Sequence, residues 1–180
     1  MKETNSTNAI ISNKLEKIYT KKDFIALVKK VIFILAFAFV VFTFIFGFYP
    51  VKGDDMVPNI KDSDLALIYR LDKRYLQNDV VLIEKNGQKY MLRIIGRPGD
   101  TVDFNKNGDV TLNGEIYEEE TIYTQTYGTN SIDLPVTLNE GEFFVLGDMR
   151  INAVDSRNFG VVYTNEIKGK VIYIFRNRNI

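Results

Sequence analysis

The stretch Tyr90-Met91-Leu92-Arg93-Ile94-Ile95-Gly96-Arg97-Pro98-Gly99-Asp100 is an apolar run that ends in a turn. Short runs of this kind, bounded by Gly and Pro, are typical of β-strands. Four more runs have the same character, at residues 65–71, 80–83, 143–146 and 170–175. Asn113-Gly114 lies between two further short runs and predicts a type I′ hairpin. The chain from 51 to 180 is therefore expected to fold as one mainly β domain, with a mixed or antiparallel sheet.

A long apolar segment precedes this domain. No charged residue occurs from 31 to 50, and 18 residues of it would form about 27 Å of helix, close to the roughly 30 Å hydrocarbon core of a bilayer. We expect residues 31–50 to form a transmembrane helix in contact with membrane lipid. A cleaved secretory signal is the alternative. The segment exceeds the usual apolar length of about 7–15 residues, however, and no small-x-small site follows it, which favours an uncleaved signal-anchor.

The lysines that precede the apolar segment predict its orientation in the membrane. Residues 1–30 hold seven lysines and three carboxylates, a balance of +4, and the other 150 residues have a balance of −4. The positive-inside rule predicts a cytoplasmic segment 1–30 and an extracellular domain 51–180 on a single-pass protein of the plasma membrane. No basic patch with interleaved aromatic residues is present, so no nucleic-acid partner is expected.

The amino-acid alphabet narrows the possible chemistry. The chain has no cysteine and no histidine. This excludes disulfides, thiolate nucleophiles and the Ser-His-Asp triad, and it leaves only carboxylates as zinc ligands. We expect no metal and no cofactor. A hydrolase built from these residues would need a lysine base or a pair of carboxylates.

Two other segments accompany the opening stretch: Gly53-Asp54-Asp55-Met56-Val57-Pro58, and Gly147-Asp148-Met149-Arg150 running on to Asp155-Ser156-Arg157. In order and spacing, the three resemble the sequence boxes of type I signal peptidases. The resemblance covers residues 31–175 and includes the N-terminal span. In particular, the chain resembles the non-catalytic signal-peptidase-like proteins of pilus assembly in Gram-positive bacteria. This resemblance implies a signal-peptidase-like β domain outside the membrane.

The resemblance also implies that the catalytic site is not intact. By position, the serine nucleophile of the family falls at Asp55, its lysine base at Leu92, and a further serine that binds the lysine at Ala153. A serine hydroxyl needs a base, and without histidine a buried lysine of lowered pKa can serve. Lys85 and Lys89 have the wrong strand parity to replace a base at position 92.

Loss of the nucleophile leaves peptide binding possible. The cleft of this family receives a peptide as an added strand, held by backbone hydrogen bonds. The residues predicted to form the cleft are Gly53, Asp54, Asp55, Met56, Val57, Tyr90, Leu92 and Ile94. A supporting loop is expected to keep its shape through ion pairs in which arginine grips carboxylates with two nitrogens. Its residues are Asp148, Arg150, Asp155, Ser156 and Arg157.

Three functions are open at this point. The first is a membrane-anchored, non-catalytic peptide-binding or chaperone factor in pilus assembly, whose extracellular partner would be a pilin subunit or a pilus sortase. The second is an active endopeptidase that processes secreted precursors, in which Asp55 and another carboxylate share a proton. The third is an assembly factor that works through residues 117–127, where the acidic run Glu118-Glu119-Glu120 lies. Such a run is usually a solvated face.

Overall fold

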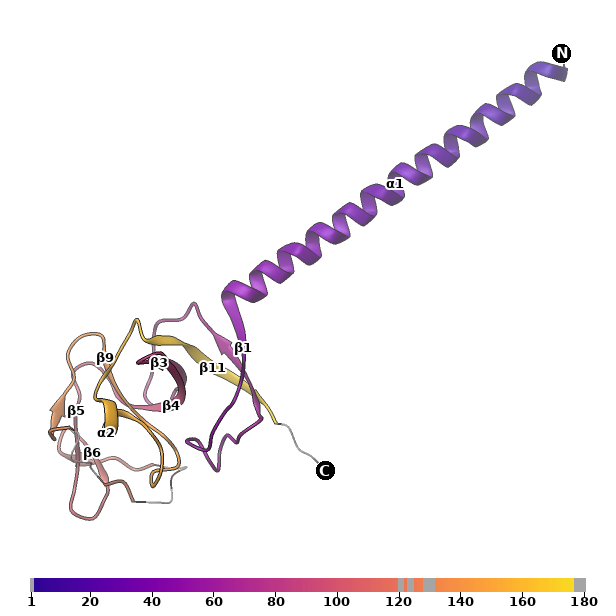
Figure 1. Cartoon of the computed structure of the whole chain (residues 1–180). Coiled ribbons are helices and arrows are strands. Elements are labelled where there is room, and N and C mark those ends of the chain that lie inside the picture. The colour runs from indigo at the N-terminus through magenta and orange to yellow at the C-terminus, as the bar shows by residue number, and fades with distance from the viewer. Residues whose placement is uncertain (1, 120–121, 123–124, 128–131, 177–180) are drawn as a thin grey trace. The chain divides into compact units, whose positions relative to one another are not determined.

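The structure, a computed structural model, describes residues 2–119, 122, 125–127 and 132–176, with side chains in the first helix described at Lys14 and from Thr20 onward. The chain divides into two compact units, Met1–Phe44 and Ile45–Ile180. The first unit is helical and consists of α1 (Lys2–Ile45), and the second is mainly β (Figure 1). The predicted class, a mainly β protein with one N-terminal apolar helix, is confirmed.

Helix α1 contains the apolar segment. Its part from Thr20 to Ile45 is long and apolar enough to cross a membrane, as a single-pass anchor would, and none of it is buried against protein. The helix ends at Ile45 rather than at the expected residue 50. Residues Phe46–Pro50 form strand β1 instead, because they pair in antiparallel register with β2 (Leu65–Tyr69). Pro50 fits this role, since β1 is an edge strand and proline in sheets is found at edges.

Two antiparallel sheets make up the second unit. The larger has seven strands in the order β1-β2-β11-β3-β4-β9-β10, and the smaller has four in the order β7-β6-β5-β8. The remaining bounds are β3 (Val80–Lys85), β4 (Gln88–Gly96), β5 (Thr101–Phe104), β6 (Val110–Leu112), β7 (Glu115–Ile116), β8 (Val136–Thr137), β9 (Glu142–Leu146), β10 (Val162–Tyr163) and β11 (Ile167–Phe175).

The predicted runs correspond to five of these strands, β2, β3, β4, β9 and β11. The predicted hairpin joins β6 to β7, with φ of 56° at Asn113 and 87° at Gly114, as a type I′ turn requires. Strands β1, β5, β8 and β10 were not among the expected elements, and neither was one helix. Helix α2 (Ser156–Phe159) is a single turn, too short to show a helical period, and it is defined by the capping residue Asp155.

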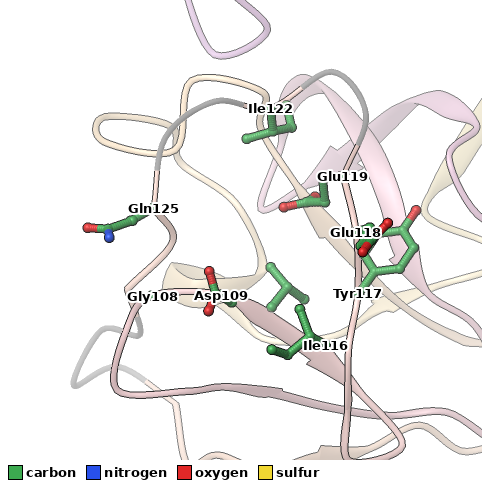
Figure 2. A pocket seen from close by; sticks show the side chains of 9 residues that line it. Gly108, Asp109, Ile116, Tyr117, Glu118, Glu119, Ile122 and Gln125 are labelled. Atoms are coloured by element: carbon green, nitrogen blue, oxygen red, sulfur yellow. The ribbon is translucent and has the colours of Figure 1, made fainter.

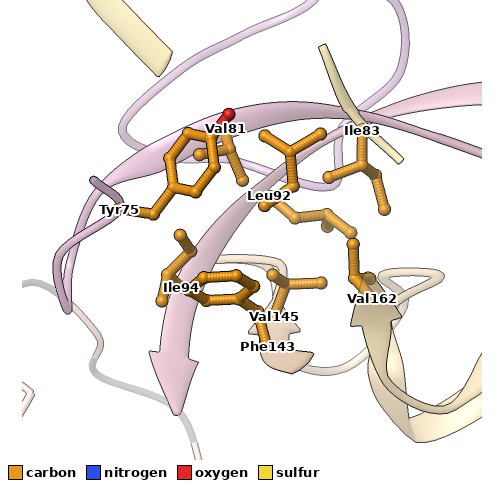
Figure 3. Close-up of a cluster of buried hydrophobic side chains, with 9 residues drawn as sticks. Tyr75, Val81, Ile83, Leu92, Ile94, Phe143, Val145 and Val162 are labelled. Carbon is orange, nitrogen blue, oxygen red and sulfur yellow. The ribbon is translucent and has the colours of Figure 1, made fainter. Parts of the chain in front are cut away.

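Three clusters of buried side chains hold the unit together. The first lies between β3, β4 and β9 and contains Leu92 and Ile94 (Figure 3). The second joins Met56, in the segment after β1, to Met91 on β4. The third lies under the smaller sheet and includes Phe144 of β9. Because β4 and β9 contribute to more than one cluster, they form the rigid base beneath the loops that carry the candidate site.

Candidate functional site

The first and last sequence boxes meet at Asp55. The backbone carbonyl of Asp55 accepts a hydrogen bond of 2.9 Å from the Met149 backbone N–H. Its side-chain Oδ1 accepts one of 3.2 Å from the Val154 backbone N–H. Gly147 permits this approach, because a Cβ there would lie 2.6 Å from the Asp55 carbonyl oxygen and 2.3 Å from the Ala153 Cβ. The residue in the nucleophile position thus fastens two segments that are about a hundred residues apart.

A pocket of about 460 Å³ opens beside this junction. Its lining residues come from the same two segments: Asp54, Asp55, Val57, Met149, Asn152 and Ala153. Both carboxylates, Asp54 and Asp55, come from the first of these segments, and the lining contains no basic side chain. Of the residues expected to form the cleft, the pocket brings together Asp54, Asp55 and Val57.

Leu92, in the position of the base, lies elsewhere. It has no exposed surface, and Figure 3 shows it packed among Val81, Ile83 and Ile94. Leu92 was expected to face the cleft, but its side chain lies in the core. The reason is strand parity, since Leu92 and Ile94 share the face of β4 that covers the first cluster. Ile94 likewise has no exposed surface.

The other expected cleft residues also have structural environments. Tyr90 is half-buried and stacks against Phe159 at a ring separation of 5.6 Å. Met56 is 2% exposed and belongs to the second cluster. Gly53 has a φ of 86°, a conformation that favours glycine, and its N–H donates to the Asp62 side chain at 2.9 Å. None of these three lines the pocket.

The electrostatics of Asp55 follow from its position. Burial raises the pKa of its carboxyl, the Val154 N–H lowers it, and the charges of Asp155 and Asp54 raise it, with a net increase. The Asp155 carboxylate is itself hydrogen-bonded within its own loop. Its oxygens accept hydrogen bonds from the Gly147 N–H at 3.1 Å and from the Arg157 guanidinium at 2.8 and 2.9 Å.

The supporting loop is held by two kinds of contact. Asp155 caps α2 in a capping box and pairs with Arg157 in the two-pronged geometry expected of arginine. Ser156 is fully buried, and its Oγ accepts the Val145 N–H at 2.9 Å. Ser156 therefore fixes the loop to β9. These contacts lie within the loop and the strand that precedes it.

Asp148 and Arg150 find partners outside the loop. Asp148 accepts hydrogen bonds from Arg93 Nε at 2.8 Å, from Arg93 Nη2 at 2.6 Å and from Asn59 Nδ2 at 2.8 Å. Burial opposes the charge of Arg93, but the hydrogen bonds and charge of Asp148 raise the pKa of Arg93 above its usual value. Sequence reasoning missed Arg93 and Asn59. Arg93 could have been suspected, since its parity places it on the face of β4 opposite Leu92.

Arg150 connects the loop to the smaller sheet. Its side chain has no exposed surface, and its guanidinium forms a two-pronged pair with Glu119 and donates to Thr126 Oγ1 at 2.6 Å. Glu119 was expected on a solvated face, and nothing in the acidic run distinguished it. Figure 2 shows Glu118 and Glu119 beside a second pocket of about 400 Å³. Glu120 lies outside the described residues.

No serine–lysine pair replaces the missing dyad in the part of the chain that the structure describes. Ser63 lies in a turn with a φ of 69°, and Ser156 is occupied by its contact with β9. Ser131 lies outside the described residues. Lys85 donates to Glu166 and to the Val161 carbonyl. The same described residues contain no group of three or more Asp or Glu side chains placed to hold a metal ion.

The chain combines an N-terminal helix that is apolar and long enough to anchor it in a membrane with a β domain in which the first and last sequence boxes meet at one pocket. These are the features expected of a protein built like a signal peptidase. The comparisons with known proteins agree. The family model "Signal peptidase, peptidase S26" matches residues 24–176. The chain belongs to the signal peptidase I family.

Its relatives are similar over most of their length. Signal peptidase I P of Bacillus subtilis subsp. natto is 30% identical over 168 residues, which is 86% of this chain and 90% of the relative. Signal peptidase I U of Bacillus subtilis (strain 168) is 31% identical, over 81% of this chain and 85% of the relative. A crystal structure of a signal peptidase I from Enterococcus faecalis V583 aligns with a TM-score of 0.47 at 27% identity, covering 55% of this chain and 97% of that chain.

Proposed function

We propose that this protein is a non-catalytic member of the family, anchored in the plasma membrane with its N-terminus in the cytoplasm, which binds an extended polypeptide on the extracellular side. Its partners are the proteins of pilus assembly, a pilin subunit or a pilus sortase. The observation that carries the proposal is the state of the two catalytic positions. The Asp55 carboxylate accepts a hydrogen bond from the Val154 N–H, and Leu92 is an apolar side chain inside the core.

This arrangement lacks what acyl transfer needs. Asp55 offers a carboxylate where a hydroxyl would attack, and Leu92 cannot take up a proton. Peptide binding has no such requirement, because an extended segment is held mainly by backbone hydrogen bonds, with side chains entering shallow pockets. The pocket between Asp54 and Asn152 is of a size that suits such a side chain, within the roughly 300–1,000 Å³ of small-molecule sites.

The test has a biochemical and a cellular arm. Detergent-solubilised full-length protein is incubated with a signal-peptide-bearing precursor, beside an active signal peptidase I as positive control, and we expect no cleavage. In cells, Asn152→Arg should fill the pocket and abolish pilus polymerisation. Asn107→Arg, at another exposed asparagine that does not line the pocket, is the matched control and should leave pilus polymerisation intact. Intact pili with Asn152→Arg would refute the assigned binding site.

One observation favours a second candidate, an endopeptidase that uses Asp55. The raised pKa of Asp55, with Asp54 beside it in the pocket lining, is what a carboxyl engaged in proton transfer requires. This candidate predicts precursor cleavage that is lost in Asp55→Ala and is strongest at mildly acidic pH. Cleavage with these properties would replace the first proposal.

A further inference from the structure

A third pocket, independent of the candidate site, lies at the start of the β domain. It has a volume of about 340 Å³ and spans β1, β2, β3, β4 and β11. Its charged lining residues are Arg70, Lys89, Lys168 and Glu84, three basic side chains and one carboxylate. In a chain with no net charge, a pocket with a net charge of +2 favours an anionic ligand.

The position of this pocket along the chain indicates which anion it meets. Gly47 lines the pocket and is two residues beyond Ile45, where the apolar helix ends. The Arg70 N–H also donates to the Ile45 carbonyl at 2.9 Å. Two extended residues span at most about 7 Å. The polar headgroup layer on each side of the hydrocarbon core is about 5–7 Å thick. Chain length alone therefore keeps Gly47, one of the residues that line the pocket, near headgroup level when the helix spans the membrane.

The three basic side chains that line the pocket are exposed. The guanidinium of Arg70 lies across the Gly47 backbone, where a Cβ would meet Nη2 at 2.5 Å. Lys168 and Glu84 are 3.6 Å apart with side chains 41% and 39% exposed, a pair too exposed to hold the lysine firmly. Lys89 is exposed and forms no ion pair with any residue that the structure describes. Tyr49 adds an aromatic ring of the kind found at membrane interfaces.

We propose that this pocket binds the phosphate of an anionic phospholipid headgroup, phosphatidylglycerol in the first instance, in the leaflet from which the β domain emerges. Bound lipid would hold the start of the domain against the membrane surface at β1. Each lysine near an anionic surface contributes about 1 kcal/mol, or about fivefold in binding.

The test measures lipid retention by the full-length protein. Protein in detergent is incubated with equal amounts of phosphatidylglycerol and phosphatidylcholine, and the lipids bound per chain are counted by native mass spectrometry. We expect the wild type to prefer phosphatidylglycerol, and Lys89→Gln/Lys168→Gln to lower this preference by roughly 25-fold. Lys61→Gln/Lys106→Gln removes the same charge at exposed lysines outside the pocket and should behave as wild type.

A charge-neutral variant checks the geometry. Gly47→Ala should displace the Arg70 guanidinium and weaken phosphatidylglycerol retention without altering net charge. Equal retention of the two lipids by wild type, or equal loss in the pocket and control double variants, would overturn the proposal. Displacement of the lipid by millimolar inorganic phosphate would also overturn it, since the site would then serve the free anion.

Discussion

Asp55 makes structural contacts at the position that corresponds to the family's serine. A serine there would present a hydroxyl to a substrate, whereas the carboxylate turns toward the backbone of the last box and accepts the Val154 N–H. The main-chain contact to Met149 is made by the carbonyl and does not depend on the side chain. The proposal of a non-catalytic protein therefore depends on the side chain of Asp55 and not on its main chain.

The raised pKa of Asp55 predicts a pH-dependent stability difference. Because its folded-state pKa lies above that of an ordinary aspartate, ionised Asp55 destabilises the fold at neutral pH. This cost disappears as the pH falls through the folded pKa toward the pKa of the unfolded chain. Asp55→Asn keeps an acceptor for Val154 and removes the charge. We expect Asp55→Asn to unfold at higher denaturant than wild type at pH 7, and the two proteins to converge under acidic conditions.

Denaturant titrations followed by tyrosine fluorescence can measure this, since the chain has 10 tyrosines and no tryptophan. Asp133→Asn, outside the pocket, serves as the control for a change of one charge. A stability gain for Asp55→Asn that grows on acidification would contradict the assigned direction of the pKa shift.

The burial of Leu92 predicts how much stability the protein would lose if a lysine were placed at position 92. Its side chain has no exposed surface and packs within the first cluster. Leu92→Lys would lose these contacts and bury an amine without a carboxylate among the cluster residues, so we expect a loss of about 3–5 kcal/mol in the free energy of unfolding. Leu76→Lys, at a leucine that is 55% exposed, should change it by no more than about 0.5 kcal/mol. Equal effects in the two variants would show that position 92 is open to water.

At the scale of elements, buried ion pairs join the site loop to its neighbours. Asp148 links it to Arg93 on β4, and Arg150 links it to Glu119 after β7. Both pairs are nearly closed to solvent, with no exposed surface on the Asp148 and Arg150 side chains. Breaking a buried pair on one side costs more than the pair contributes, because the remaining charge stays buried.

This asymmetry predicts unequal roles for two adjacent acidic residues. Among the residues that the structure describes, Glu119→Ala would leave buried Arg150 with Thr126 and a backbone carbonyl as its hydrogen-bond partners. It should lower the free energy of unfolding by about 3–5 kcal/mol. Glu118→Ala, at an exposed neighbour, should have an effect near zero. Thermal unfolding of both variants provides the comparison. If the two residues contributed alike, the acidic run would be a solvated face after all.

Across the whole molecule, the elements that depend on neighbouring residues could be predicted from the sequence. The elements that depend on pairing between distant segments could not. Strands such as 143–146 and the Asn113-Gly114 hairpin follow from residues adjacent in sequence, and both were predictable. The end of α1 was not, because Phe46–Pro50 is apolar enough to continue the helix and becomes a strand only through pairing with β2. The site shows the same division. The pocket at Asp55 lies where two boxes converge, whereas the burial of Leu92 depends on which sheet face the cluster covers.

Strand β1 begins at the residue after α1 ends, with no linker between them. A flexible tether lets a binding domain sample a volume set by its length, and that volume sets the effective concentration of the partner. Here the tether has no length, so a helix α1 that spans a membrane would keep Phe46 next to the bilayer. For the peptide-binding function proposed above, this would favour partners that bring their binding segment close to the bilayer, so that a partner's distance from its own membrane anchor would become a criterion of selection.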